Sequence, residues 1–409
     1  MYQEITRCRI SGSSNLVNVL SLGEQYLTGV FPSSPDQVVT KGPVDMVWCP
    51  ESGLVQMKQS YSLEEMYGDN YGYRSGLNQS MVNHLQNKVN MLLRKVETHP
   101  GDIILDIGSN DATSLKCYPA HLRRIGIDPT GKKFKEFYTD DISLVPDFFT
   151  AENFRKIFPD EKATIVTSIA MFYDLEDPVR FASDIASVLA ENGIWHFEQS
   201  YLPSMLRTNS YDTICQEHLE YYSLIAVQYI LEKAGLRIID VEMNDINGGS
   251  FAVTAARKSS SHKANRAVIE WMVEEEIRMG LNTEAPYRAF AERVAGHRQS
   301  LLDLLDRLKN DGKKIIGYGA STKGNVLLQY CNIGTQYLDC IAEVNEQKFG
   351  SYTPGTLIPI ISEKEAKAMK PDYLFVLPWH FRNNILGREK EYRASGGKFI
   401  FPLPFIEIV

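Results

Sequence analysis

The chain has 409 residues, too many for one ordinary domain, so we expect two or three. Its hydrophobic content of 44% and charged content of 23% are typical of a globular protein with a full core. The net charge of -8 argues against a general binder of nucleic acid or of an anionic membrane, but it leaves room for a local pocket that holds one phosphorylated small molecule.

Nothing in the sequence predicts a membrane or secreted protein. No apolar run approaches the ~18 residues that a membrane span needs, and the first residues have no hydrophobic signal core. Six scattered cysteines do not resemble a disulfide framework in a chain of this size. We therefore expect a cytoplasmic monomer with no nucleic-acid or membrane partner.

Residues 1–80 combine turn-forming residues with short strand-like runs, which predicts a small mixed lobe. A helix follows, because Met81, Leu85, Val89 and Leu92 recur three or four positions apart. The lobe is therefore expected to end where that helix begins.

From residue 81 to residue 257, apolar runs alternate with helical segments, as in a parallel sheet covered on both faces. The expected parallel strands are 102–107, 124–127, 164–167 and 193–197. Two later runs that can close the sheet as an antiparallel pair are 236–239 and 250–254. This pattern predicts a doubly wound α/β domain.

A polar run at 258–261 marks a boundary, and a long helix with one apolar stripe follows it. A second α/β unit comes next, with expected strands at 313–317, 338–342, 373–377 and 398–401. The sequence thus predicts three domains, at 1–80, 81–257 and 258–409. The last of them is a helical linker followed by a Rossmann-like fold.

The first strand of the central domain ends in a turn that fits a charged cofactor. Asp106, Gly108 and Asn110 lie there, and a helix is expected to start at the same place. A dinucleotide site needs three glycines at such a turn, and Asp106 would repel its pyrophosphate. A sulfonium cofactor with an amino acid group favours an acid instead, and Asp128 on the next strand can accept both ribose hydroxyls. We expect S-adenosylmethionine; the alternative is a sheet with ordinary strand-end acids.

Ligands of such sheets bind beyond the carboxyl ends of the strands. This rule nominates Phe148 after the third strand, and Ser168 and Met171 after the fourth, as further walls of the cofactor pocket. For Phe148, a place in the core is an equally good interpretation.

Ionisable residues gather beyond the strand that ends near Phe197. Glu217 and His218 lie together there, where a substrate would face the cofactor. An imidazole beside an acid is the usual means of abstracting a proton near neutral pH. Because adjacent residues in regular structure cannot both face one pocket, we expect His218 to be the base and Glu217 to orient a partner or bind substrate. The alternative is a structural histidine that caps the sheet.

Three motifs together resemble one enzyme family. Residues 106–111 read Asp-Ile-Gly-Ser-Asn-Asp, residues 217–222 read Glu-His-Leu-Glu-Tyr-Tyr, and residues 317–324 read Gly-Tyr-Gly-Ala-Ser-Thr-Lys-Gly. In this order, along essentially the whole chain, they are similar to the sugar C-methyltransferases of deoxysugar biosynthesis. The resemblance implies a class I methyltransferase domain that methylates carbon 3 of a nucleotide-linked 4-keto-6-deoxyhexose. It also implies that His218 is the base and Glu217 a substrate ligand.

This chemistry suits the residues. A proton beside a ketone is too weak an acid for direct removal, so a base must act while the growing enolate oxygen is stabilised. The enolate carbon then attacks the methyl group in line with its sulfur, which requires alignment more than acid catalysis.

The chain departs from the family at two active-site positions. Cys215 stands where the family often has a tyrosine, and Phe172 or Tyr173 where it often has a histidine. Another tyrosine is then expected to supply a hydroxyl, and the sequence does not choose among the candidates. They are Tyr73 and Tyr222 as partners of the base, and Tyr71 and Tyr221 as substrate ligands.

The family usually begins with two Cys-x-x-Cys pairs that hold a structural zinc. Here each pair has one cysteine, so that Cys8 is matched with Ser11 and Cys49 with Ser52. A tetrahedral structural zinc needs four nitrogen or sulfur donors, and a serine hydroxyl is too weak an acid to replace a thiolate. We expect no zinc and a lobe held by hydrogen bonds and core packing, with Cys8 and Cys49 close in space.

The resemblance also makes the C-terminal domain the holder of the nucleotide diphosphate. Its glycine turn has neither the dinucleotide spacing nor the residues of an ATPase phosphate loop, but a lysine and exposed backbone N–H groups can still bind a diphosphate. The expected substrate contacts are Gly319, Ser321, Lys323, Glu343 and Lys348. The alternative is a vestigial fold with a structural role.

Two other classes of protein compete with this hypothesis. A nicotinamide-dependent sugar oxidoreductase needs a complete glycine fingerprint, which is absent. A non-catalytic nucleotide-binding or scaffolding protein leaves the ionisable residues around His218 unexplained. An O-methyltransferase acting on a nucleotide sugar is a variant of the main hypothesis, and the sequence leaves thymidine and guanosine diphosphate carriers equally open.

Overall fold

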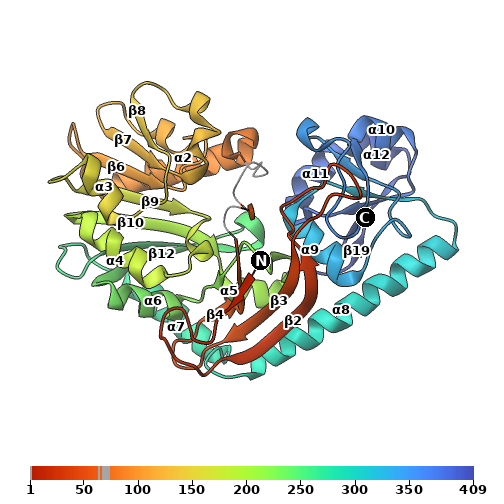
Figure 1. Cartoon of the computed structure of the whole chain (residues 1–409), viewed down its shortest axis with the longest axis horizontal. Helices are drawn as coiled ribbons and strands as arrows, with labels where there is room; N and C mark the ends of the chain where they lie inside the picture. Colours follow the sequence, from red (N-terminus) through yellow and green to blue (C-terminus); the bar gives the residue numbers. More distant parts are fainter. Residues whose placement is uncertain (1, 63–64, 67–73) are drawn as a thin grey trace.

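The computed structural model describes residues 2–62, 65–66 and 74–409. Figure 1 shows the central domain in yellow and green on one side and the C-terminal domain in blue on the other. The red strands of the N-terminal lobe lie between them. The long helix α8 (Ala285–Asn310) runs along the N-terminal lobe and the C-terminal domain. Within the described residues, no helix has the length and apolar character that crossing a membrane requires.

The central domain is built on a sheet with the strand order β12-β13-β10-β9-β6-β7-β8. Its strands are β6 (Ile103–Ile107), β7 (Arg123–Ile127), β8 (Ile142–Val145), β9 (Ala163–Ile169), β10 (Leu189–Ser200), β12 (Leu236–Asn244) and β13 (Ser250–Arg257). The pairs among β6 to β10 are parallel, and β13 is antiparallel to both of its neighbours. This is the order of a class I methyltransferase, with its topological switch between β6 and β9.

Helices cover both faces of this sheet because its buried strands are apolar on both sides. They are α2 (Gln79–Lys95), α3 (Ala151–Ile157), α4 (Pro178–Val188), α6 (Leu224–Lys233) and α7 (Arg266–Arg278), whereas α5 (Leu202–Thr208) packs with α8. Successive residues point to opposite faces, so Ile104 packs with Leu92 of α2, whereas Leu105 packs with Ile185 of α4 and Ile230 of α6.

The helix expected after Gly108 does not form where the sequence placed it. Asn110 and Ala112 have positive φ angles of 51° and 60°, which end any right-handed helix. The segment is a loop that leads into a single 3₁₀ turn at Leu115–Cys117. The expected helix start was therefore wrong, although the loop remains at the end of β6.

The N-terminal lobe borrows a strand from the segment that carries the ionisable residues. Its strands are β1 (Tyr2–Glu4), β2 (Val17–Tyr26), β3 (Lys41–Trp48), β4 (Val55–Met57) and β5 (Gln59–Tyr61). A short strand, β11 (Glu220–Tyr221), pairs with β4 in the sheet order β11-β4-β3-β2. The chain just after His218 is thereby fixed to the N-terminal lobe.

The C-terminal domain contains a second, mostly parallel sheet with the order β16-β15-β14-β17-β18-β19. Its strands are β14 (Ile315–Tyr318), β15 (Ile341–Glu343), β16 (Ile360–Ser362), β17 (Tyr373–Val376), β18 (Lys398–Phe401) and β19 (Glu407–Ile408). Its helices are α9 (Thr322–Cys331), α10 (Glu363–Ala368), α11 (Arg382–Arg388) and α12 (Lys390–Ala394). One hydrophobic core joins this domain to α8 and to the N-terminal lobe, where Trp48 packs on Tyr287 with ring centroids 5.3 Å apart.

Candidate functional site

A single cavity of about 1260 Å³ lies where the three parts of the chain meet. Small-molecule sites usually enclose about 300–1,000 Å³, so there is room here for more than one ligand. Most of the residues that the sequence nominated from both α/β domains line it: Asp106, Gly108, Asn110, Asp128, Phe148, Met171, Glu217, His218, Gly319, Ser321, Lys323, Glu343 and Lys348. The structure thus brings the two predicted ligand sites into one chamber.

Three nominated residues lie elsewhere. Ser168 is buried in the sheet, where its hydroxyl accepts a hydrogen bond from Trp195 Nε1 at 3.2 Å. Tyr222 is buried against Phe172, to whose carbonyl its hydroxyl donates at 3.4 Å. Tyr221 lines a separate, much smaller cavity behind the site. All three side chains pack inside the protein, so the expectation that they line the large ligand cavity was wrong.

Tyr71 and Tyr73, nominated as a substrate ligand and as a partner of the base, lie outside the described residues. Arg74, the first described residue after them, lines the cavity, where its side chain lies on the ring of Phe137. Arg74 Nε also lies 3.7 Å from Asp111 Oδ2, so the described chain resumes beside the loop that follows β6.

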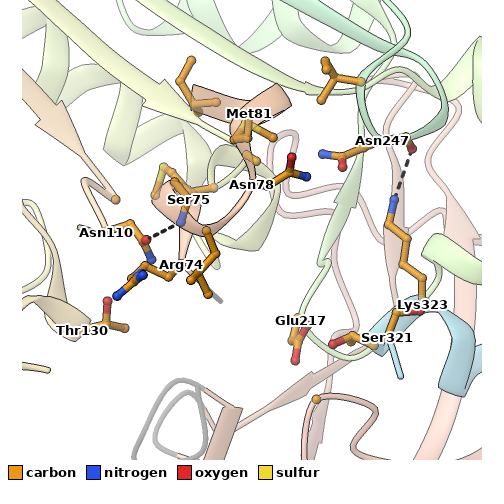
Figure 2. Close-up of a pocket in the computed structure, with 18 of the residues that line it drawn as sticks. Arg74, Ser75, Asn78, Met81, Asn110, Thr130, Glu217, Asn247, Ser321 and Lys323 are labelled. Carbon is orange, nitrogen blue, oxygen red and sulfur yellow. Dashed lines mark hydrogen bonds between the residues drawn. The ribbon is translucent and has the colours of Figure 1, made fainter. Parts of the chain in front are cut away.

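The loop after β6 is tied to its neighbours on both sides. Asn110 N donates to Asp128 Oδ2 at 2.7 Å, which fixes the loop to the end of β7. Asn110 Oδ1 accepts from Ser75 N at 3.0 Å (Figure 2). Gly108 has a φ of 73°, and a Cβ there would lie 3.1 Å from Met171 Cγ, so a side chain would be strained and crowded. The backbone is therefore presented to the cavity without a side chain in front of it.

Asp106 is a buried acid at the edge of this cavity. Its Oδ1 accepts from Thr167 Oγ1 at 2.5 Å. Burial raises the pKa of Asp106 to about 7, the hydrogen bond from Thr167 opposes the rise, and Asp128 adds to it. A cationic ligand would stabilise the ionised carboxylate. The sulfonium and ammonium groups of S-adenosylmethionine supply such a charge, so the residues present fit this cofactor.

The sequence interpretation missed a polar network around Glu198. It forms the roof of the cavity beside the loop that follows β6, which is called the cofactor end below. Glu198 at the end of β10 receives His84 Nε2 at 2.6 Å, Lys88 Nζ at 3.0 Å and Asn244 Nδ2 at 2.8 Å. Burial opposes ionisation of Glu198, but His84 and Lys88 outweigh it and hold its pKa at about 2. The network fixes α2 over the sheet, and the spacing of His84 and Lys88 by one helical turn was the sequence signal for it.

His218 has the hydrogen bonding of a neutral imidazole. Its Nδ1 lies 2.7 Å from the carbonyl oxygen of Thr213, so Nδ1 carries the proton and Nε2 keeps its lone pair. The ring packs edge-on against Tyr173 with centroids 4.5 Å apart. Burial and, to a smaller extent, the charge of Lys323 lower the pKa of His218 to about 4. The hydrogen bond to the Thr213 carbonyl opposes this shift. The imidazole is therefore neutral near pH 7.

Glu217 faces the same cavity as His218, because the chain between the 3₁₀ turn at Tyr211–Thr213 and β11 is irregular. It lies against the backbone of Gly29, where an added Cβ would come within 2.2 Å of Glu217 Oε1. Glu217 and Ser321 line the same cavity (Figure 2). Burial raises the pKa of Glu217 to about 7, so this acid holds a proton near neutrality more readily than an exposed glutamate does.

The N-terminal lobe and the C-terminal part of the chain both hold the segment that carries these two residues. From the C-terminal domain, Trp379 Nε1 donates to Asp212 Oδ2 at 2.7 Å. From the N-terminal lobe, the Gln25 carbonyl accepts from Gln216 Nε2 at 3.2 Å. The hydroxyl of Tyr211 meets Nδ1 of His297 on α8 at 3.0 Å. The positions of Glu217 and His218 thus depend on contacts with the other parts of the folded chain.

On the C-terminal side, Glu343 and Lys348 support the glycine turn. Glu343 Oε2 accepts from Ala320 N at 2.7 Å, and its Oε1 accepts from Val344 N at 2.7 Å. Lys348 Nζ donates to the Ala320 carbonyl at 2.7 Å. Although both side chains line the cavity, their polar atoms hold the turn in place. Ser321 begins α9 by accepting a hydrogen bond from the backbone N–H three residues on, at 3.0 Å.

The four positions of the suspected metal site come together as two thiol–hydroxyl pairs. Cys8 Sγ lies 3.3 Å from Ser52 Oγ, and Cys49 Sγ lies 3.4 Å from Ser11 Oγ. No group of three or more histidine, cysteine, aspartate or glutamate side chains placed to hold a metal occurs among the residues that the structure describes. Two thiols with two hydroxyls do not fit a structural zinc, which needs four nitrogen or sulfur donors.

Comparison with known proteins agrees with this architecture. A family model for the C-methyltransferase C-terminal domain matches residues 245–404, a methyltransferase domain model matches residues 81–241, and a model named for zinc binding matches residues 8–67. The C-methyltransferase NovU of Streptomyces niveus is 31% identical over 404 residues, which cover 98% of this chain and 96% of the relative.

Two solved methyltransferase structures each match about half of the chain. The N-methyltransferase NodS of Bradyrhizobium japonicum WM9, in complex with S-adenosyl-L-homocysteine, is 14% identical, with a TM-score of 0.34 over 48% of this chain and 96% of its own. The magnesium protoporphyrin IX methyltransferase ChlM of Synechocystis PCC 6803 is 15% identical, with a TM-score of 0.34 over 48% of this chain and 92% of its own. At these TM-scores the two likenesses add nothing to the assignment. From the full-length relative and the domain models, the chain belongs to the C-methyltransferase family and is an S-adenosylmethionine-dependent C-methyltransferase.

Proposed function

We propose that the enzyme methylates carbon 3 of a nucleotide-linked 4-keto-6-deoxyhexose. One observation carries this proposal: His218, which keeps a lone pair on Nε2, lines a cavity that runs from the loop after β6, here called the cofactor loop, to the glycine turn of the C-terminal domain. A C-methyltransferase must create a carbon nucleophile, and removing a proton beside a ketone does so. The family resemblance of the three motifs supplies the sugar and the position on it.

The residues of the chain divide the work. Nε2 of His218 takes the proton from carbon 3. Glu217, protonated near neutrality, donates a hydrogen bond to an oxygen of the sugar. The bound S-adenosylmethionine supplies the electrophilic methyl group, with Asp106 and Asp128 holding it at the cofactor loop. The backbone N–H groups at the start of α9 face the same cavity and bind the diphosphate.

The proposal is tested by incubating the enzyme with S-adenosylmethionine and a panel of 4-keto-6-deoxy nucleotide sugars that differ in carrier and configuration. Mass spectrometry should show one added methyl group on at least one member of the panel. The corresponding sugars whose ketone has been reduced should remain unchanged, because they have no acidic proton. Methylation of the reduced sugars would contradict the proposal and favour an O-methyltransferase.

The pH dependence of kcat/KM follows from these two ionisable groups of the free enzyme. Activity is expected to fall as the pH drops through about 4, because His218 becomes protonated and loses its lone pair. Activity is also expected to fall as the pH rises through about 7, because Glu217 loses the proton that it donates. In Glu217→Gln the amide keeps a donor at every pH, so the loss above pH 7 should disappear from the rate profile. If that loss persists in the variant, Glu217 does not cause it.

We further propose that the N-terminal lobe folds without zinc, because Ser11 and Ser52 replace two thiolate ligands. Metal analysis of the purified protein should find no stoichiometric zinc. The double variant Ser11→Cys, Ser52→Cys restores four sulfur donors around one point and should bind one zinc per chain. Stoichiometric zinc in the unaltered protein would show that two thiols are enough here.

A further inference from the structure

Lys323 reaches from the C-terminal domain across the cavity to the central domain. It lies in the first turn of α9, and its Nζ donates to the carbonyl oxygen of Asn247 at 3.2 Å (Figure 2). Asn247 belongs to the loop between β12 and β13, at the edge of the sheet that also presents the cofactor loop. An ammonium group has three donors, and among the described residues this is the one hydrogen bond that Lys323 makes.

The ammonium group of Lys323 interacts with several ionisable residues, among them His218, which lines the same cavity. The field of Lys323 lowers the pKa values of His218 and His380, and the carboxyl group of Asp212 is close enough to be affected by it. Cys215, which also lines the cavity, acts on Lys323 in turn. Lys323 and His218 thus line the same cavity and interact electrostatically.

Other cations that line the cavity are engaged by protein groups. Lys348 holds the Ala320 carbonyl, and Arg388 contacts the Tyr318 hydroxyl and Glu363. Lys323 thus keeps donors available for a ligand in the cavity, and a partly buried ammonium with unused donors is costly unless something binds it.

We propose that Lys323 is a catalytic residue whose ammonium group binds the ketone oxygen of the sugar and stabilises the enolate. This inference rests on the proposed function. The C–H bond at carbon 3 breaks, its proton goes to Nε2 of His218, its electron pair forms the C3–C4 double bond, and the carbonyl π pair moves to the oxygen beside Lys323. The new C–C bond then forms as the S–CH₃ bond breaks and the carbonyl is restored. His218 finally releases its proton to solvent.

The neighbouring Asp212 distinguishes this role from the diphosphate contact that the sequence suggested. Its carboxyl group is buried and offsets part of the lysine charge, so the pair attracts a diphosphate less strongly than a lone ammonium group would. An enolate oxygen carries a single charge that appears during the reaction, where a preorganised donor acts most strongly. The C-terminal domain therefore contributes to the chemistry as well as to binding.

The test measures hydrogen exchange at carbon 3 in deuterated water, with S-adenosylhomocysteine in place of the methyl donor so that no methyl transfer occurs. In Lys323→Met, exchange should be slower by about a hundredfold or more. Affinity for the free nucleoside diphosphate should stay within about threefold of the unaltered enzyme by calorimetry. Lys313→Met, which alters a half-exposed lysine paired with Asp372 outside the cavity, should exchange at the full rate.

A second readout excludes a merely structural effect. Removing the charge at Lys323 should move the acidic limb of the rate profile to higher pH, because this charge helps to lower the pKa of His218. Lys323→Arg keeps the charge and should leave that limb in place. Full exchange in Lys323→Met, or loss of nucleoside-diphosphate affinity with exchange intact, would overturn the assignment of Lys323 alone. Absence of exchange in the unaltered enzyme with every 4-keto sugar would instead overturn the proposed function.

Discussion

Replacing His218 by asparagine is expected to lower kcat by about 10²–10⁴-fold, the range that general base catalysis contributes. The asparagine amide can still donate to the carbonyl oxygen of Thr213, which the imidazole contacts at 2.7 Å, so the segment should keep its shape. What the variant loses is the lone pair at Nε2. Single-turnover rates with the sugar identified by the substrate panel measure this loss directly.

Cofactor binding provides the control for this variant. His218 lies beyond the cofactor loop, so the dissociation constant for S-adenosylhomocysteine should change little, and the stabilisation of the folded state by this ligand should persist. His218→Ala is expected to be equally inactive but less stable, because it also leaves the Thr213 carbonyl without its donor. A single-turnover rate in His218→Asn within about tenfold of the original would remove His218 as the base.

Glu198→Ala is expected to reduce the free energy of unfolding by about 3–5 kcal/mol, the typical cost of breaking a buried ion pair from one side. Glu198 is only 2% exposed, and its loss leaves Lys88 and His84 without their carboxylate under the roof of the cavity. Because α2 would loosen over the cofactor end, the affinity for S-adenosylhomocysteine should fall as well. Denaturant unfolding and calorimetry measure the two effects.

Glu242→Ala is the matched control, since Glu242 also contacts Lys88, at 3.4 Å, but its side chain is 40% exposed. Removing it should cost at most about 1 kcal/mol. The pKa of Glu198 is lowered from 4.5 to about 2, so its contribution to stability is complete above pH 4.5 and is lost as the pH falls toward 2. Equal effects of the two substitutions, or an unchanged acid denaturation profile in Glu198→Ala, would contradict this account.

The sequence predicted the features that follow from parallel strands. Asp106 and Asp128 were placed together because the carboxyl ends of neighbouring parallel strands meet at one edge of a sheet, and both acids line the same cavity in the structure. It also predicted the antiparallel closure by β12 and β13. These inferences needed only the apolar pattern and the positions of polar residues at strand ends.

Other features depended on packing that no local pattern encodes. Ser168 was expected to face the cofactor but turns toward Trp195, because the face on which a strand residue lies depends on register. The rule that adjacent residues cannot face one pocket did not apply to Glu217 and His218, since their segment is irregular. His84, which lies 114 residues before Glu198, and Lys88 could be seen as a pair from their helical spacing, but only the assembled fold shows that Glu198 joins them.

The central claim is that the enzyme removes the proton at carbon 3 and puts the methyl group in its place. A 4-keto-6-deoxy nucleotide sugar labelled with deuterium at carbon 3 tests this claim when product mass and position are followed together. We predict that each methylated product has lost its deuterium and carries the methyl group on carbon 3. A methylated product that keeps the deuterium, with the methyl group on oxygen, would contradict the account.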